Sequence, residues 1–233
     1  MKASDLVGVP IEWGAALRDR RLFHPRGVLA DGRIERVAPP DEGLPVPSGP
    51  VVGRLSKAVG VPGSLPDAAG LAWRMFAGPS GDSPWDVLLV TAGIGDASAV
   101  PNRLLLHPVT AWADTRYSSL MPLAYRGQLW WVRARLVTDI AADGLALDAV
   151  ADTLAHGDID FDIEQACSSA DFHPLARLRL SEIRPVTAPE QDVSFDPVRN
   201  TAPGVCVWPQ WLRTFRRLAY RRSREGRDGP ATP

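Results

Sequence analysis

The chain has 233 residues, a formal net charge of -1 and an isoelectric point near 6.4. This length suits a single core, and the nearly balanced charge disfavours a nucleic-acid or anionic-membrane binder of the strongly basic class. Because Cys167 and Cys206 are the two cysteines and no apolar run approaches membrane-spanning length, a disulfide framework and a membrane partner are not expected, and we expect a cytoplasmic location.

The first half of the chain shows a proline-rich crossing, two strands and one helix. Residues 34–50 hold five prolines, which exclude a regular ladder or helix, so we expect a surface crossing there. Residues 51–56 and 85–91 are short and apolar-rich, and both are predicted as strands. Between them, the stretch from Pro66 to Met75 is predicted as a helix.

The second half continues with further strands, and helices are predicted over about 145–155 and from Pro209 to Glu225. We expect the strands at 129–137, 159–163 and 175–183. Successive strands with helices at the margins favour an α+β fold, an antiparallel β-barrel with flanking helices and a C-terminal helix. One domain is predicted over residues 1–225, followed by a disordered tail at 226–233.

Three aspartates alternate with apolar residues in the predicted strand around residue 160. Asp158, Asp160 and Asp162 are separated by Ile159 and Phe161. This alternation is typical of a strand with one buried and one wet face. We prefer that interpretation to a divalent-metal cluster, which the same carboxylates could form with a nearby histidine.

Three segments in the first half of the chain are similar, in order and residue type, to motifs of the haem catalase superfamily. Residues 21–27, Arg-Leu-Phe-His-Pro-Arg-Gly, resemble the family's Arg-x-x-His-x-Lys-Gly segment. Residues 50–56, Pro-Val-Val-Gly-Arg-Leu-Ser, resemble its Pro-Val-x-x-Arg-Phe-Ser strand. The run Trp85-Asp86-Val87 resembles the Trp-Asp-Leu opening of a later segment of the family.

The C-terminal part of the chain carries the same resemblance. Phe195-Asp196-Pro197 leads to Pro203-Gly204, and then to Pro209, Arg216 and Tyr220 at the family's spacing. The common order of these motifs resembles a short, divergent catalase-like protein. The resemblance implies a catalase-like barrel that holds a b-type haem as cofactor.

The cofactor-binding residues follow from the resemblance. Tyr220 stands where the family has the proximal iron ligand, and tyrosinate is a known axial ligand of haem iron. Arg216 lies four residues earlier, on the same side of the predicted helix, and can stabilise the phenolate. Arg21 and Arg54 stand where arginines would pair with the haem propionates.

The residues expected to act on peroxide are His24 and Ser56. His24 stands at the distal position, where an imidazole can take a proton from peroxide and return it to the departing oxygen, with Ser56 as its support. Val90 and Thr91 stand where the family has a distal asparagine. We therefore expect peroxidase or hydroperoxide chemistry, on hydrogen peroxide or an organic hydroperoxide, rather than fast catalase turnover.

Two other functions remain open from the sequence. The first is a degenerate barrel without haem that binds a ligand or partner, or that acts as a phosphodiesterase-type hydrolase, as short chains with a similar Leu-Ser-Lys pattern are sometimes described. The second is nucleic-acid binding through the arginines at 213–227, which we rank last because these residues are typical of a solvated helix face. The oligomeric state is left open, a homo-oligomer included.

Overall fold

The computed structural model describes residues 26–57, 67–92, 108–113, 115–142, 144–188 and 191–209. The elements in chain order are β1 (Arg26–Arg36), β2 (Gly49–Lys57), β3 (Ala69–Ala77), β4 (Ser83–Thr91), β5 (Arg116–Ser118), β6 (Leu123–Tyr125), β7 (Gln128–Leu136), α3 (Leu147–His156), β8 (Ile159–Cys167), β9 (His173–Ile183) and β10 (Cys206–Val207). The predicted strands after residues 51, 85, 129, 159 and 175 are all present, with boundaries shifted by a few residues.

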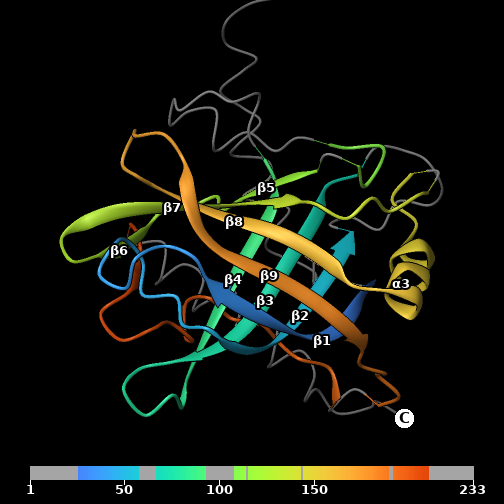
Figure 1. Ribbon diagram of the computed structural model, residues 1–233, viewed down its shortest axis with the longest axis horizontal. Helices are drawn as coiled ribbons and strands as arrows, with labels where there is room; N and C mark the ends of the chain where they lie inside the picture. The colour runs from blue at the N-terminus through green and yellow to red at the C-terminus, as the bar shows by residue number, and fades with distance from the viewer. Residues whose placement is uncertain are drawn as a thin grey trace, which may run out of the picture.

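Eight of these strands close into an antiparallel barrel. Their order is β7-β5-β4-β3-β2-β1-β9-β8, and β8 pairs with β7 to complete the circle. The two short strands β6 and β10 extend the sheet beside β7. Figure 1 shows β8 and β9 crossing in front of β3 and β4, which form the other side of the barrel. The expected antiparallel barrel is confirmed.

Large apolar side chains fill the interior of the barrel. They come from alternating positions along each strand, such as Leu71, Trp73 and Met75 on β3, which are all almost fully buried. Trp85 on β4 and Phe161 on β8 are equally enclosed in the same core cluster. An eight-stranded barrel is just wide enough for side chains to fill it. A flat organic cofactor therefore has no room inside this barrel.

The helix expected between Pro66 and Met75 is wrong, because the residues from Ala69 to Ala77 form β3. Leucine, alanine, methionine and arginine all favour helices, and this composition suggested one. The chain instead pairs with β2 on one side and β4 on the other, from Lys57↔Ala69 through Ala77↔Ser83. Burial of every second side chain inside the barrel outweighs the small difference in intrinsic propensity.

The proline-rich crossing is shorter than expected and closes one end of the barrel. β1 continues to Arg36 and β2 begins at Gly49, so the loop spans residues 37–48. Leu44 and Val46 of this loop are buried in the barrel core. Prolines prevent regular backbone pairing in this loop, and the guanidinium of Arg36 satisfies its carbonyl groups instead. It donates hydrogen bonds to the carbonyls of Pro39, Glu42, Leu44 and Val46.

A buried glutamine holds the same loop from the opposite strand. Gln165 on β8 has no exposed surface, and its Oε1 accepts a hydrogen bond from the backbone N–H of Leu44 at 2.8 Å. The side chain lies directly against Gly43, which has φ 72°. A Cβ at Gly43 would lie 2.1 Å from the amide atoms of Gln165, so the loop needs glycine there for space as well as for its backbone.

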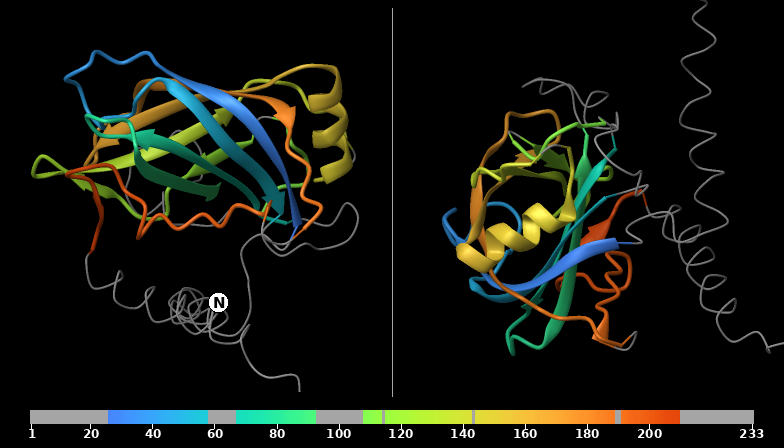
Figure 2. Two further views of the ribbon diagram at one scale, coloured as in Figure 1. Left: turned by 90° about the horizontal axis from the view of Figure 1, so that it is seen from below. Right: turned by 90° about the vertical axis from the view of Figure 1, so that its right-hand side faces the viewer.

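Helix α3 covers the other end of the barrel. Figure 2 shows α3 and the loop 37–48 at opposite ends of the molecule. Val150 and Leu154 of α3 are buried in the core, and the indole Nε1 of Trp112 donates to the carbonyl of Ala146 just before the helix, at 3.1 Å. The helix expected over about 145–155 is thus confirmed, and it begins two residues later and ends one residue later than expected.

Over the described parts of the chain the protein is mostly β, with α3 as its one helix. This is less helical than the expected α+β fold with several flanking helices. The predicted C-terminal helix from Pro209 to Glu225 and the tail at 226–233 lie outside the described residues, apart from Pro209 itself. Within the described ranges no helix combines the length and the apolar character that crossing a bilayer requires.

Candidate functional site on the outside of the barrel

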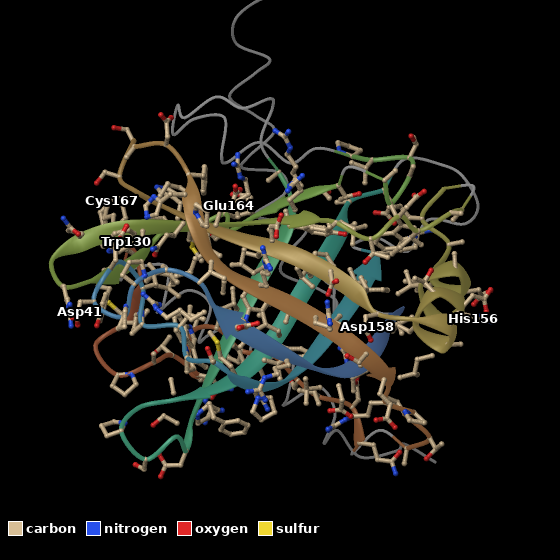
Figure 3. The ribbon with its side chains drawn as sticks, in the orientation of Figure 1. Asp41, Trp130, His156, Asp158, Glu164 and Cys167 are labelled. Carbon is tan, nitrogen blue, oxygen red and sulfur yellow. The ribbon has the colours of Figure 1, made fainter. Side chains whose placement is uncertain are left out.

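The outer surface of β7, β8 and β9 is charged. Cross-strand ion pairs of 2.7, 2.6 and 2.7 Å line it, between Arg133 and Glu164, Arg135 and Asp162, and Arg179 and Asp160. Figure 3 labels Glu164 and Asp158 along this surface. The aspartates alternate with the buried Ile159, Phe161 and Ile163, so the interpretation as a wet strand face is confirmed. We call this surface the charged wall.

The outer surface of β1 to β4 has the opposite character. Apolar side chains on it form two small clusters separate from the barrel core, and the polar residues Arg54, Arg74 and Asp86 lie among them. We call this surface the apolar wall and define it by Leu29 on β1, Val52 on β2, Ala72 on β3, and Leu88 and Val90 on β4. Leu29, Ala72 and Val90 are nevertheless buried. Phe195 and Val193, from the segment that follows β9, pack in the same cluster as Leu29 and Ala72, so this segment already covers part of the wall.

Arg54 is the cation of β2 on this wall. Its side chain is 12 % exposed, and it forms an ion pair with Asp192 from the segment that follows β9. Its guanidinium carbon lies 5.5 Å from the ring centre of Phe195, within cation–π range. Burial lowers the pKa of Arg54. Arg54 is expected from the sequence to pair with a carboxylate of haem, and in this structure it pairs with a carboxylate of the chain itself.

Ser56 lies two residues further along β2 and faces the same side as Arg54. It is almost fully buried, and its hydroxyl donates to the carbonyl of Gly70 on β3 at 3.3 Å. The structure therefore brings the two described site residues, Arg54 and Ser56, together on the apolar wall. The other expected site residues, Arg21, His24, Arg216 and Tyr220, lie outside the described residues.

Asp86 joins two motifs that are more than a hundred residues apart. Its carboxylate is fully buried and accepts Nε and Nη2 of Arg74 at 2.7 and 2.8 Å. The same group accepts the backbone N–H of Asp196 at 2.7 Å and the amide of Asn200 at 2.8 Å. Hydrogen bonding to Asp86 raises the pKa of Arg74. The Trp-Asp motif and the Phe-Asp-Pro motif are therefore in direct contact.

Phe195 completes this junction on the apolar wall. Its ring packs in one cluster with Leu29 and Ala72, and the guanidinium carbons of Arg54 and Arg74 lie 5.5 and 5.8 Å from the ring centre. Both distances are within cation–π range, where a guanidinium group is attracted by the negative face of the ring. The motif residues Arg54, Asp86 and Phe195 form one contiguous group outside the barrel.

The positions of the expected distal donor are apolar or already bonded. Val90 is buried with Ala68 and Ala92 and packs near Leu120. The hydroxyl of Thr91 accepts the backbone N–H of Ala69 at 3.2 Å, on the other side of β4. Neither side chain offers a free polar donor to a ligand on the apolar wall.

Arg74 and Asp192 are functional candidates that the sequence does not single out. Arg74 lies in the run that was expected to be helical, so its place opposite Asp86 could not be inferred. Asp192 lies in an irregular segment without periodicity. The sequence indicates Asp192 only indirectly. A buried arginine in an apolar strand requires an anion, and a carboxylate of the chain can supply it.

No group of three or more histidines, cysteines, aspartates and glutamates with metal-binding geometry occurs in the parts of the chain that the structure describes. The catalase-like resemblance rests on the motifs alone, since no family model and no curated protein matches the chain.

Proposed function

We propose that this chain is a haem-binding, catalase-like protein whose porphyrin lies against the apolar wall, and that it reduces hydrogen peroxide or organic hydroperoxides as a peroxidase. The observation that carries the proposal is the convergence of the resembling motifs. Arg54, Asp86 and Phe195 come from three separate segments and meet on one outer surface of a closed antiparallel barrel.

The residues of the apolar wall suit a porphyrin in character. A porphyrin is a flat apolar disc with two carboxylates, and the wall offers aliphatic side chains beside Arg54. The filled interior leaves the outside of the barrel as the place for such a disc. Arg54 is the described residue that would hold a propionate, in the paired geometry that guanidinium groups form with carboxylates. Asp192 occupies that position in the present structure and Val193 packs in the same cluster as Val52 and Leu88, so the disc would have to displace both residues.

In this proposal the reacting groups come from both ends of the chain. His24 takes a proton from the bound peroxide and returns it to the departing oxygen, with Ser56 as a hydrogen-bond partner of the imidazole. Tyr220 would hold the iron as phenolate, and Arg216 would stabilise the charge of that phenolate. The haem, when bound, supplies the electrons for cleavage of the peroxide O–O bond.

The surroundings of Val90 favour peroxidase activity over fast disproportionation. A second polar donor beside the imidazole would help to orient peroxide, and Val90 with its alanine neighbours cannot donate. His24 alone would then position the substrate. We expect slow consumption of peroxide that accelerates when a reducing co-substrate is added.

The test is an optical spectrum of the full chain purified from haem-supplied cells. We expect a Soret band that Tyr220→Phe shifts in wavelength, because the axial ligand changes. Tyr125→Phe is the matched control, since this tyrosine is on β6 beside Arg126 and away from the apolar wall. Colourless protein that also fails to bind added haemin would contradict the proposal.

A second candidate is a barrel without cofactor that binds another ligand or partner. The observation in its favour is that Asp192 already neutralises Arg54. Spectrally silent protein that hydrolyses a generic phosphodiester, with activity lost on chelation, would favour the hydrolase form of this candidate. Spectrally silent protein without that activity would favour the binding form.

A further inference from the structure

The segment after β9 crosses the apolar wall as a strap, which we define as residues 191–200. Figure 2 shows this orange segment running along the outside of β2 to β4. Its C-terminal half is fixed through Asp86, which accepts hydrogen bonds from the backbone of Asp196 and the side chain of Asn200. Arg74 also donates to the carbonyl of Ser194 at 2.8 Å. The N-terminal half contacts the wall through the ion pair between Asp192 and Arg54.

The two partners of this ion pair differ in exposure. The side chain of Arg54 is 12 % exposed, whereas that of Asp192 is 42 % exposed. An aspartate that leaves the pair enters water at little cost, because it is already largely hydrated. The arginine stays in a poorly hydrated place and then needs another anion. The pair is therefore asymmetric, with a fixed cation and a replaceable carboxylate.

The surroundings of Arg54 select the kind of anion that would replace Asp192. Val52 and Phe195 lie next to the arginine, so an apolar body gains from burial there. An open depression borders Asp192 and gives access to its carboxylate from solvent, and most of the residues that line it are polar, among them Arg74, Arg184 and Gln191. The chemistry fits a carboxylate attached to an apolar body better than a small hydrated anion.

We infer that Asp192 is a resident carboxylate that occupies Arg54 until an amphipathic carboxylate ligand displaces it. The inference rests on the proposed function in using the same wall, and a haem propionate would be one such carboxylate. Displacement releases residues 191–193 from the wall, while the Asp86 junction keeps the rest of the strap in place. The strap thus lowers the affinity of the site for any carboxylate ligand and opens when one binds.

The experiment is calorimetric titration of the full chain with decanoate, with decanol as the uncharged probe. Asp192→Asn removes the competing charge, and we expect it to bind decanoate about fivefold more tightly than the wild type. Arg54→Met should lose the preference for decanoate over decanol. Asp162→Asn is the matched control, since its side chain is 37 % exposed against 42 % for Asp192 and its ion pair lies on the charged wall, and it should leave decanoate binding unchanged.

Equal affinity of the wild type and Asp192→Asn for decanoate, or absence of binding to both, would overturn the inference. Titration of the same variants with haemin separates it from the proposed function. Haemin that binds no variant, together with the expected decanoate pattern, rejects the haem proposal and supports the strap. Haemin that binds all variants equally, without a decanoate effect at Asp192, rejects the strap and leaves the haem proposal standing.

Discussion

Replacement of Asp86 by asparagine is the strongest test of how the strap is attached to the barrel. The carboxylate has no exposed surface and accepts four hydrogen bonds, two from Arg74, one from the backbone of Asp196 and one from Asn200. An asparagine offers one carbonyl oxygen in place of two carboxylate oxygens. Its NH2 group must then face at least one of the donors that now point at Asp86.

The magnitude follows from these contacts. Loss of a charge-assisted hydrogen bond costs about 1.5–3 kcal/mol, and an arginine left without its buried partner adds to that cost. Because Arg74 is 24 % exposed and can be partly hydrated, we expect Asp86→Asn to lower the free energy of unfolding by about 2–4 kcal/mol. Asp162→Asn, which breaks an exposed pair, should cost less than about 1 kcal/mol.

Urea denaturation followed by tryptophan fluorescence measures both values under the same conditions. A double variant with Arg74→Met should lose less than the sum of the two single variants, because the second change removes a charge that has no partner left. A loss below about 1 kcal/mol for Asp86→Asn, or strict additivity with Arg74→Met, would refute the reasoning.

Two further predictions concern the barrel itself. Gly43→Ala should lower the free energy of unfolding by about 2 kcal/mol, because the added Cβ would collide with Gln165 and φ at this position is 72°. Gly81→Ala is the control: φ is 66° but the space around it is open, so it should lower the free energy of unfolding by about 1 kcal/mol. Equal urea midpoints of the two variants would contradict this prediction. Tyr117→Phe should stabilise the protein by about 1 kcal/mol, since the buried hydroxyl of Tyr117 has no partner among the described residues. Burial raises the pKa of Tyr117, so the wild type should also lose stability by up to about 1.4 kcal/mol per pH unit above about pH 10, where the unfolded tyrosine ionises and the folded one does not. Parallel stability profiles of wild type and variant between pH 9 and 11 would count against this assignment.

The sequence predicts the strands with clear apolar patterns. Residues 85–91 are a nearly continuous apolar run, 129–137 are rich in valine and tryptophan, and 159–163 alternate strictly, so β4, β7 and β8 follow from the sequence. The succession of strands also suffices for an antiparallel barrel. The pairing of β7 with β8 closes the barrel and joins segments that local patterns do not connect. Closure is nevertheless expected once eight antiparallel strands enclose one core.

Five strands are not predicted from the sequence, namely β1, β3, β5, β6 and β10, and for β1 and β3 the reason can be identified. β3 is rich in helix-favouring residues, and only its alternating Leu71, Trp73 and Met75 indicate a strand. The pairing of β1 with β9 shifts between Asp31 and Gly32, where β9 carries the extra residue Ser181. The side-chain pattern of β1 is weak there, because Gly32 stands between the buried Ala30 and Ile34. Gly32 lies at that bulge, where a Cβ would meet the carbonyl of Arg179 at 2.0 Å.

The candidate site is predicted from the sequence only in part. The motif residues Arg54 and Ser56 are found because their residue types resemble a family pattern, and the structure places both on the apolar wall. Asp192 and Arg74 have no such pattern. Their roles depend on which segment crosses the wall, and this is a property of the closed barrel rather than of any local stretch of sequence.

The most direct measurement of the central claim is haemin affinity by Soret titration in three proteins: the wild type, Leu88→Trp on the apolar wall and Arg177→Trp on the exposed outer side of β9. The large indole at Leu88 should obstruct a disc on this wall and weaken haemin binding by about tenfold or more, whereas Arg177→Trp should leave it unchanged. Equal haemin binding by all three proteins, or stronger loss from Arg177→Trp, would contradict a haem site on the apolar wall.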